Sequence, residues 1–145
     1  MDFVTSEKPS FGSASGVDDG RRISTGNAED PRFASRGGWF VGDFLDNRSG
    51  LRRDSPLAVK WGVHKAGDTR SEPSASASEN SLALLVSGVF QLRFPGEFPM
   101  QVVLEECGDY VLFGPGVQHL WEALEDSVIV TIRWRACAPV NLGGA

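Results

Sequence analysis

The chain has 145 residues, of which 41% are hydrophobic and 23% are charged. This length suffices for one domain with a hydrophobic core, and the composition is that of a soluble globular protein. The formal net charge of −5 argues against nucleic acid or an anionic membrane surface as the main partner, because both select basic protein surfaces.

Cysteine content and the ends of the chain bear on its location. Cys107 and Cys137 are the two cysteines, which is too few for a disulfide framework. Residues 1–10 lack a basic segment followed by an apolar run, so no signal peptide is expected. No apolar stretch approaches the length of a membrane-spanning helix. We therefore expect a cytoplasmic protein with reduced thiols and no membrane partner.

The first 36 residues differ in character from the rest. Residues 1–36 are rich in Ser, Gly, Asp and Arg and have neither helical nor strand periodicity. We expect them to form an irregular, partly disordered N-terminal arm. From residue 37 onward, short apolar runs alternate with turn residues, and no segment keeps a 3.6-residue period. Residues 37–145 are therefore predicted to form one all-β domain with little helix.

The predicted strands follow one another at short intervals. They cover residues 38–45, 57–64, 81–94, 100–106, 107–116, 117–124 and 127–134. The longest of these segments is predicted to be two strands bent at Gly88. Many short strands separated by Gly and Pro turns favour a barrel or a sandwich.

One segment is more specific. Residues 108–119, GDYVLFGPGVQH, resemble the second signature of the cupin superfamily, in which a Gly-Asp turn, a strand and a Pro/Gly turn precede a histidine. The glycine spacing to His119 fits, and the proline is displaced by one position to Pro115. The resemblance covers roughly residues 57–135 and is closest to small single-domain bacterial cupins. It implies a jelly-roll barrel, the double-stranded β-helix, with a pocket in its mouth and commonly a homodimer.

The first cupin signature is degenerate in this chain. It usually has two histidines and a glutamate ahead of a strand that ends in glycine, as residues 82–88 do. Counting back from Gly88 puts the glutamate position at Ser81 and the histidine positions at Ser74 and Ser76. Serine hydroxyls are poor metal ligands at neutral pH, so we expect a barrel without a metal cofactor. The hydroxyls of Ser74 and Ser76 are candidates to hydrogen-bond a ligand instead.

His119 is the strongest candidate for catalysis. By the two-residue period of a strand, it shares a face with Val117, Trp121 and Ala123, and the resemblance turns that face into the barrel. A histidine beside Trp121 in an apolar cavity has a perturbable pKa and an aromatic wall for a ligand. The alternative is a structural histidine bound to a backbone carbonyl.

The other candidates are less specific. His64 shares a strand face with Lys60 and Gly62, which is either the pocket face or the solvent face. If both histidines face inward, they can act as acid and base on opposite sides of a substrate.

Three further side chains are candidate ligand-binding residues. Trp61 could form an aromatic pocket with Trp121, or both could be core residues. Gln91 is a polar residue on the alternate face of its strand. Arg133 either binds a carboxylate or lies on the outer face of its strand, and the more apolar alternate row there favours the outer face.

These observations lead to three hypotheses of function. The first is a metal-independent acid–base enzyme, of the isomerase, cyclase or lyase type, acting on an apolar or aromatic biosynthetic intermediate. The second is a non-catalytic cupin that binds a small ligand or serves in regulation. The third is a metal-dependent oxygenase or lyase, with His64, His119 and a carboxylate such as Glu72 or Glu79 as ligands.

Overall fold

The structure is a computed structural model that describes residues 23–53 and 56–137. The chain divides into two compact units, residues 1–61 and 62–145, and the boundary falls inside strand β2 (Leu57–His64). The predicted N-terminal arm lies in the first unit, and its residues 1–22 are outside the described part. The boundary expected near residue 36 stays a prediction.

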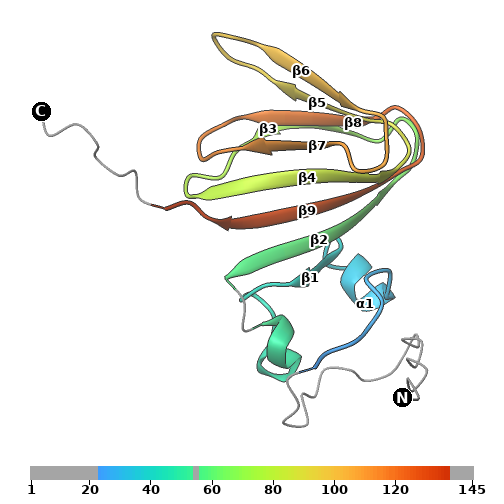
Figure 1. Cartoon of the computed structure of the whole chain (residues 1–145), viewed down its shortest axis with the longest axis vertical. Helices are drawn as coiled ribbons and strands as arrows, with labels where there is room; N and C mark the ends of the chain where they lie inside the picture. Colours follow the sequence, from blue (N-terminus) through green and yellow to red (C-terminus); the bar gives the residue numbers. More distant parts are fainter. Residues whose placement is uncertain (1–22, 54–55, 138–145) are drawn as a thin grey trace, which may run out of the picture. The chain divides into compact units, whose positions relative to one another are not determined.

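The first unit holds short elements (Figure 1). They are helix α1 (Pro31–Ala34), strand β1 (Trp39–Val41), the 3-10 segment η1 (Asn47–Arg52) and the first part of β2. Asp30 begins α1, because its carboxylate accepts from the backbone N–H of Arg32 at 2.9 Å. The pair β1–β2 is antiparallel, with Trp39 opposite Lys60.

The second unit consists of two antiparallel sheets (Figure 1). In one sheet the strands have the order β2-β9-β4-β7, with β4 (Glu79–Ser87), β7 (Tyr110–Phe113) and β9 (Ser127–Arg135). The other has the order β3-β8-β5-β6, with β3 (Thr69–Ser74), β5 (Phe90–Phe94), β6 (Met100–Leu104) and β8 (His119–Ala123).

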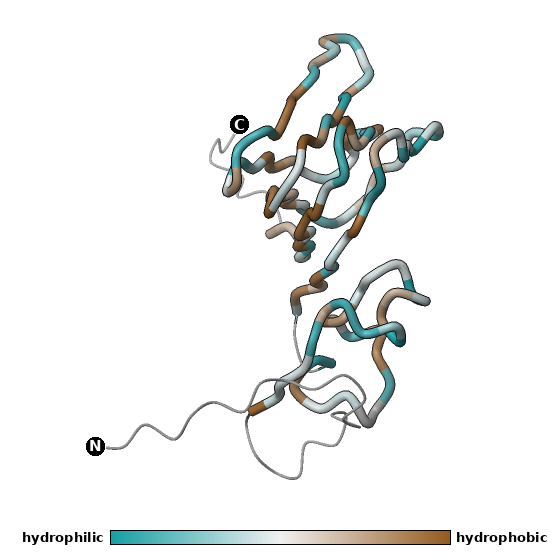
Figure 2. Tube along the Cα trace, turned by 90° about the vertical axis from the view of Figure 1, so that its right-hand side faces the viewer, coloured by the Kyte–Doolittle hydropathy of each residue, from teal (hydrophilic) through white to brown (hydrophobic). Residues whose placement is uncertain are grey.

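The hydrophobic core lies between these two sheets. One sheet contributes Ala83, Leu85 and Ile129, and the other contributes Phe90, Leu92, Leu104 and Ala123, all at most 5% exposed. Alternate residues of each strand supply this core, as expected for sheets buried on one face. Figure 2 shows apolar residues, in brown, at many positions along the trace of this unit.

The structure confirms an all-β chain with little helix. The strands predicted on either side of Gly88 are β4 and β5, which turn at this residue with φ of 89°. Strand β3 was not predicted. Among the described residues, no helix is long and apolar enough to cross a membrane.

Candidate functional site

Polar side chains line one end of the space between the two sheets. Ser81 on β4 is 3% exposed, and it lies directly opposite Arg133 on β9 and Phe113 on β7. Residues paired in this way project to the same side of a sheet. Arg133 and Phe113 therefore share the inward face with Ser81, beyond the apolar core.

This position corrects the expectation that Arg133 lies on the outer face. Ser127 and Ile129 belong to the same alternating row of β9 as Arg133, and they are only 2% and 3% exposed. Their row faces inward, and Arg133 is half-buried. The more apolar row of β9, which includes Val130 and Ile132, therefore faces outward. The apolar character of the alternate row predicted the wrong face for Arg133, because this sheet has apolar residues on both sides.

His119 lies at the same end, on the other sheet. It is 7% exposed, is paired with Ser74 on β3, and contacts the Phe113 ring with 4.6 Å between the ring centroids. Its Nδ1 is 3.4 Å from the carbonyl oxygen of Val117. In the tautomer that donates from Nδ1, the lone pair is on Nε2.

Burial and neighbouring cations keep His119 neutral. Burial is the main cause that lowers the pKa of His119, and the positive charges of Arg133 and Arg70 lower it further. The hydrogen bond to Val117 acts in the opposite direction. At neutral pH the imidazole is therefore uncharged, the form that accepts a proton.

The charge at this end is mainly positive. Burial lowers the pKa of Arg133, the nearby Glu79 raises it, and Arg70 lowers it. Arginine stays protonated in proteins, so two cations and one carboxylate act on the space beside His119. Such an excess of positive charge in a partly buried site favours an anionic ligand.

An aromatic cluster occupies the next layer of the interior. Trp121 stacks on Phe90 with 5.3 Å between centroids, and the His64 ring lies 4.5 Å from the Trp121 ring. His64 also lies 5.4 Å from the Phe90 ring, so it points toward the interior. The two histidines contact different aromatic rings: His64 touches Trp121, and His119 touches Phe113.

The two serines of the degenerate signature have different environments. Ser74 is a direct cross-strand neighbour of His119. Ser76 belongs to the turn before β4, where its hydroxyl oxygen accepts from the N–H of Glu79 at 3.1 Å. Its own carbonyl accepts from the N–H of Gly116 at 2.8 Å. Ser76 therefore holds two turns together, and Ser74 is the serine that lies beside the histidine.

Trp61 and Gln91 are not part of this arrangement. Trp61 belongs to the first unit, where its indole N–H donates to Glu29 at 3.2 Å. On β2 it alternates with His64, so the two side chains lie on opposite faces of the strand. Gln91 faces away from Phe90 and Leu92, and its amide oxygen can accept from Nε of Arg93 at 2.8 Å.

A metal site of the usual kind does not fit these residues. Throughout the described ranges, no three His, Cys, Asp or Glu side chains lie close enough to hold a metal ion. The ligand set of His64, His119 and a carboxylate is therefore not assembled. The residue directly opposite His119 on β3 is Ser74.

Some residues of the site were missed in the sequence. Arg70 escaped notice because it lies on β3, a strand without an apolar pattern. Phe113 lies within the cupin-like motif, and its alternation with Val111 on β7 indicates a common face.

Comparison with solved structures gives the fold. A cupin protein from Bacteroides fragilis is 18% identical over 61% of this chain and 74% of that chain, with a TM-score of 0.50. The chain has the cupin fold. KdgF from a Halomonas species is 21% identical over 57% of this chain and 73% of that one, with a TM-score of 0.49. The CENP-C cupin domain of Drosophila melanogaster is 19% identical over 57% of this chain and 61% of that one, with a TM-score of 0.44.

The similarity is confined to structure. No protein-family model matches the chain, and no curated protein matches it in sequence. Cupin folds carry many unrelated reactions, so function has to be argued from the site.

Proposed function

We propose that the cupin barrel binds a small carboxylate with an apolar or aromatic body at the end formed by His119 and Arg133. The observation that supports this most directly is the inward, half-buried guanidinium of Arg133 on the strand row that continues the core. A guanidinium binds a carboxylate with two parallel hydrogen bonds. Phe113 and Phe94, whose ring centroids are 5.3 Å apart, supply apolar surface for the rest of the ligand.

The same arrangement supports acid–base catalysis without a metal. Neutral His119 is a competent base, and Nε2 carries its lone pair when Nδ1 donates to Val117. In the proposed reaction Nε2 takes a proton from a carbon of the bound carboxylate and returns a proton to the same or a neighbouring carbon. The outcome is an isomerisation, with no change of oxidation state and no additional reactant. His64 is held against Trp121 and would act on the opposite side of a ligand.

The alternative is a barrel that binds the carboxylate without reacting with it. A buried histidine with one backbone partner is also a common structural arrangement. Proton exchange between water and a bound carbon acid separates the two functions, because a pure binding protein does not catalyse it.

Titration with 3-phenylpropionate tests the binding site. Replacing Arg133→Gln removes a hydrogen bond to a charged group, worth about 1.5–3 kcal/mol, so binding should weaken about 10- to 100-fold. Methyl signals of Val111 and Ala83, which are neighbours in the β4–β7 pair, report ligand in the barrel. Arg133→Lys should retain part of the affinity.

Lys65→Gln serves as the matched control. It removes the same charge from a side chain that is 82% exposed, and should leave the affinity unchanged. Equal affinity of Arg133→Gln and the unaltered protein would contradict the proposal.

A second part of the proposal concerns self-association. The sheet β9-β4-β7 has an apolar outer face, defined here as Leu82, Leu84, Tyr110, Leu112, Val130, Ile132 and Trp134. Tyr110 and Leu112 on the edge strand are 61% and 52% exposed. Contiguous apolar surface of this kind marks a protein interface. We propose that a second copy of the chain covers it, giving a homodimer, because none of these seven residues is charged and identical faces can therefore meet without repulsion.

We further propose a cytoplasmic location. Both cysteines are free and exposed in the structure. Reduced thiols of this kind are typical of a reducing compartment.

A further inference from the structure

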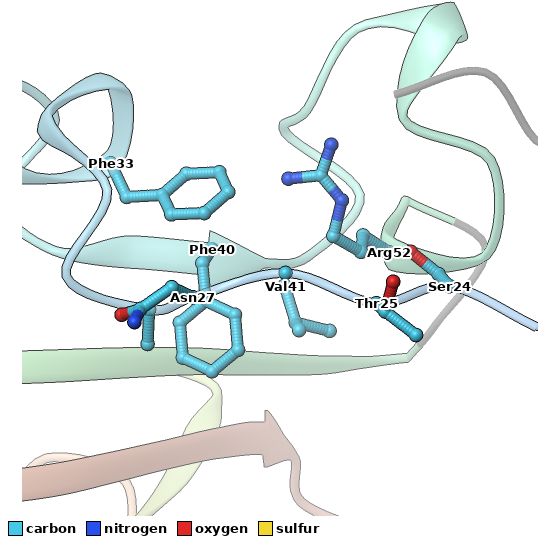
Figure 3. Close-up of a pocket in the computed structure, with 9 residues that line it drawn as sticks. Ser24, Thr25, Asn27, Phe33, Phe40, Val41 and Arg52 are labelled. Atoms are coloured by element: carbon cyan, nitrogen blue, oxygen red, sulfur yellow. The ribbon is translucent and has the colours of Figure 1, made fainter. Parts of the chain in front are cut away.

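The first unit contains a pocket of its own, outside the cupin barrel (Figure 3). Its volume is about 400 Å³, and it is lined by residues 24–28 together with Phe33, Phe40, Val41 and Arg52. Small-molecule sites have volumes of about 300–1,000 Å³. The pocket therefore has room for a ligand the size of a substituted benzene ring.

The walls are mainly apolar, and their apolar residues come from separate elements. Phe33 lies on α1, while Phe40 and Val41 lie on β1. The rings of Phe33 and Phe40 have centroids 6.0 Å apart and planes inclined by 44°. Two inclined rings of this kind leave an apolar surface on which a flat or branched hydrocarbon group can pack.

Among the described residues that line the pocket, Arg52 is the cationic one. The guanidinium carbon of Arg52 lies 5.0 Å from the centroid of the Phe33 ring, and Figure 3 shows both side chains at the pocket. The backbone carbonyl of Arg52 accepts from Gly42 N–H at 2.8 Å, which holds the end of η1 against the region of β1. The guanidinium is thus held by the fold at the pocket wall.

Charges of both signs surround Arg52. Burial and the nearby Arg32 and Arg36 lower its pKa, whereas Asp46 and Asp30 raise it. Arginine stays protonated in proteins, so a carboxylate at the pocket wall would meet a positively charged side chain.

We infer that this pocket is a second ligand site, which takes a small apolar monocarboxylate with its hydrocarbon body between Phe33 and Phe40 and its carboxylate on Arg52. The inference is independent of the barrel site, because it depends only on residues of the first unit. The body of the ligand is held by apolar contact and its charge by the guanidinium, so both features are required for binding.

A comparison of phenylacetate with phenylacetamide tests this on the unaltered protein. Both have the same ring, but only the acid offers a charged partner to Arg52. We expect the acid to bind at least about 10-fold more tightly and to shift the methyl signals of Val41 and Ala28. Equal binding of acid and amide, or shifts confined to Val111 and Ala83 in the barrel, would overturn the inference.

Two arginine variants separate this pocket from the barrel. Arg52→Gln should abolish the shifts of Val41 and Ala28 and leave those of Val111 and Ala83 in place, whereas Arg133→Gln should have the reverse effect. Lys65→Gln should change neither. An amide spectrum of Arg52→Gln checks its fold, and the acid–amide comparison decides the question without any variant. If Val41 still shifts with full affinity in folded Arg52→Gln, the inference is wrong.

Discussion

At the scale of single residues, His119 has the features of a base before any substrate is known. It is buried, its pKa is lowered mainly by that burial, and Arg133 and Arg70 add to the effect. A base with a lowered pKa is in its active form over a wider range of pH. The rate of a reaction that uses neutral His119 should therefore rise with pH and level off below pH 6.5, the ordinary pKa of histidine.

Phenylpyruvate in heavy water offers a direct measurement of this behaviour. The proton on the carbon next to its keto group is acidic, and exchange for deuterium is followed by NMR. The unaltered protein should accelerate the exchange, with a plateau that begins below pH 6.5, and His119→Gln should lose at least about 100-fold of the acceleration.

His64→Gln is the matched control for this experiment, because it makes the same substitution at the other histidine, which contacts Trp121 instead of Phe113. We expect His64→Gln to lose less of the acceleration than His119→Gln, because His64 is held against Trp121. Full exchange activity in folded His119→Gln would show that His119 is not the base, and no acceleration by the unaltered protein would favour a binding function.

The residues of the site differ in how well the sequence predicts them. The alternation around His119 and Trp121 indicated a common face, and both side chains lie inside the unit. Val117, expected on that face, precedes β8 and is 36% exposed, because the strand begins only at His119. Arg133 was expected outside since its strand has an apolar row on each side, and only the register with β4 identifies the inner one.

At the scale of elements, β3 shows the limit of pattern reading. The segment TRSEPS is at the edge of its sheet, has no apolar residue in it, and is exposed at five of its six positions. Strands are recognised in a sequence by alternating apolar residues, so a polar edge strand has no signal. Pro73 is tolerated because an edge strand has a side without a partner strand. The long-range pairing with β8 forms the strand.

The predicted bend at Gly88 is found in the structure as the turn between β4 and β5. The φ of Gly88 is 89°, and a Cβ there would collide with the carbonyl oxygen of Asp126 and lie 2.7 Å from Cα of Ser127. Gly88→Ala should therefore cost about 1–2 kcal/mol for the left-handed conformation. A further 1–3 kcal/mol or so is expected from overpacking. Urea unfolding measures the total.

Gly108 is a matched control because it has nearly the same φ, 94°, and nothing lies within 4 Å of its Cβ position. Gly108→Ala should lose only the conformational part, about 1–2 kcal/mol. If Gly88→Ala and Gly108→Ala have equal free energies of unfolding, the contact of position 88 with Asp126 and Ser127 does not add to the cost of a side chain there.

At the scale of the whole molecule, the two faces of the sheet β9-β4-β7 are both apolar for different reasons. The inner face packs against the second sheet around Leu85 and Ile129. The outer face has Leu112 and Tyr110 exposed on its edge strand. A monomer would leave this surface in water at a cost of about 25 cal/mol per Å² of apolar area. Association of two chains through the outer face removes that cost.

Leu112→Asp tests the dimer, because it places a charge on the outer face opposite Leu82 on β4. Two such faces brought together would bury like charges, so the variant should be a monomer in light scattering at micromolar concentration, where the unaltered protein should be a dimer. Phe98→Asp is the control, since Phe98 is 86% exposed in the turn between β5 and β6 and lies off this face. A dimer that survives Leu112→Asp, or dissociates equally in Phe98→Asp, would assign the contact to another surface. A dimer lost only in Leu112→Asp would explain why β9 has apolar residues on both sides.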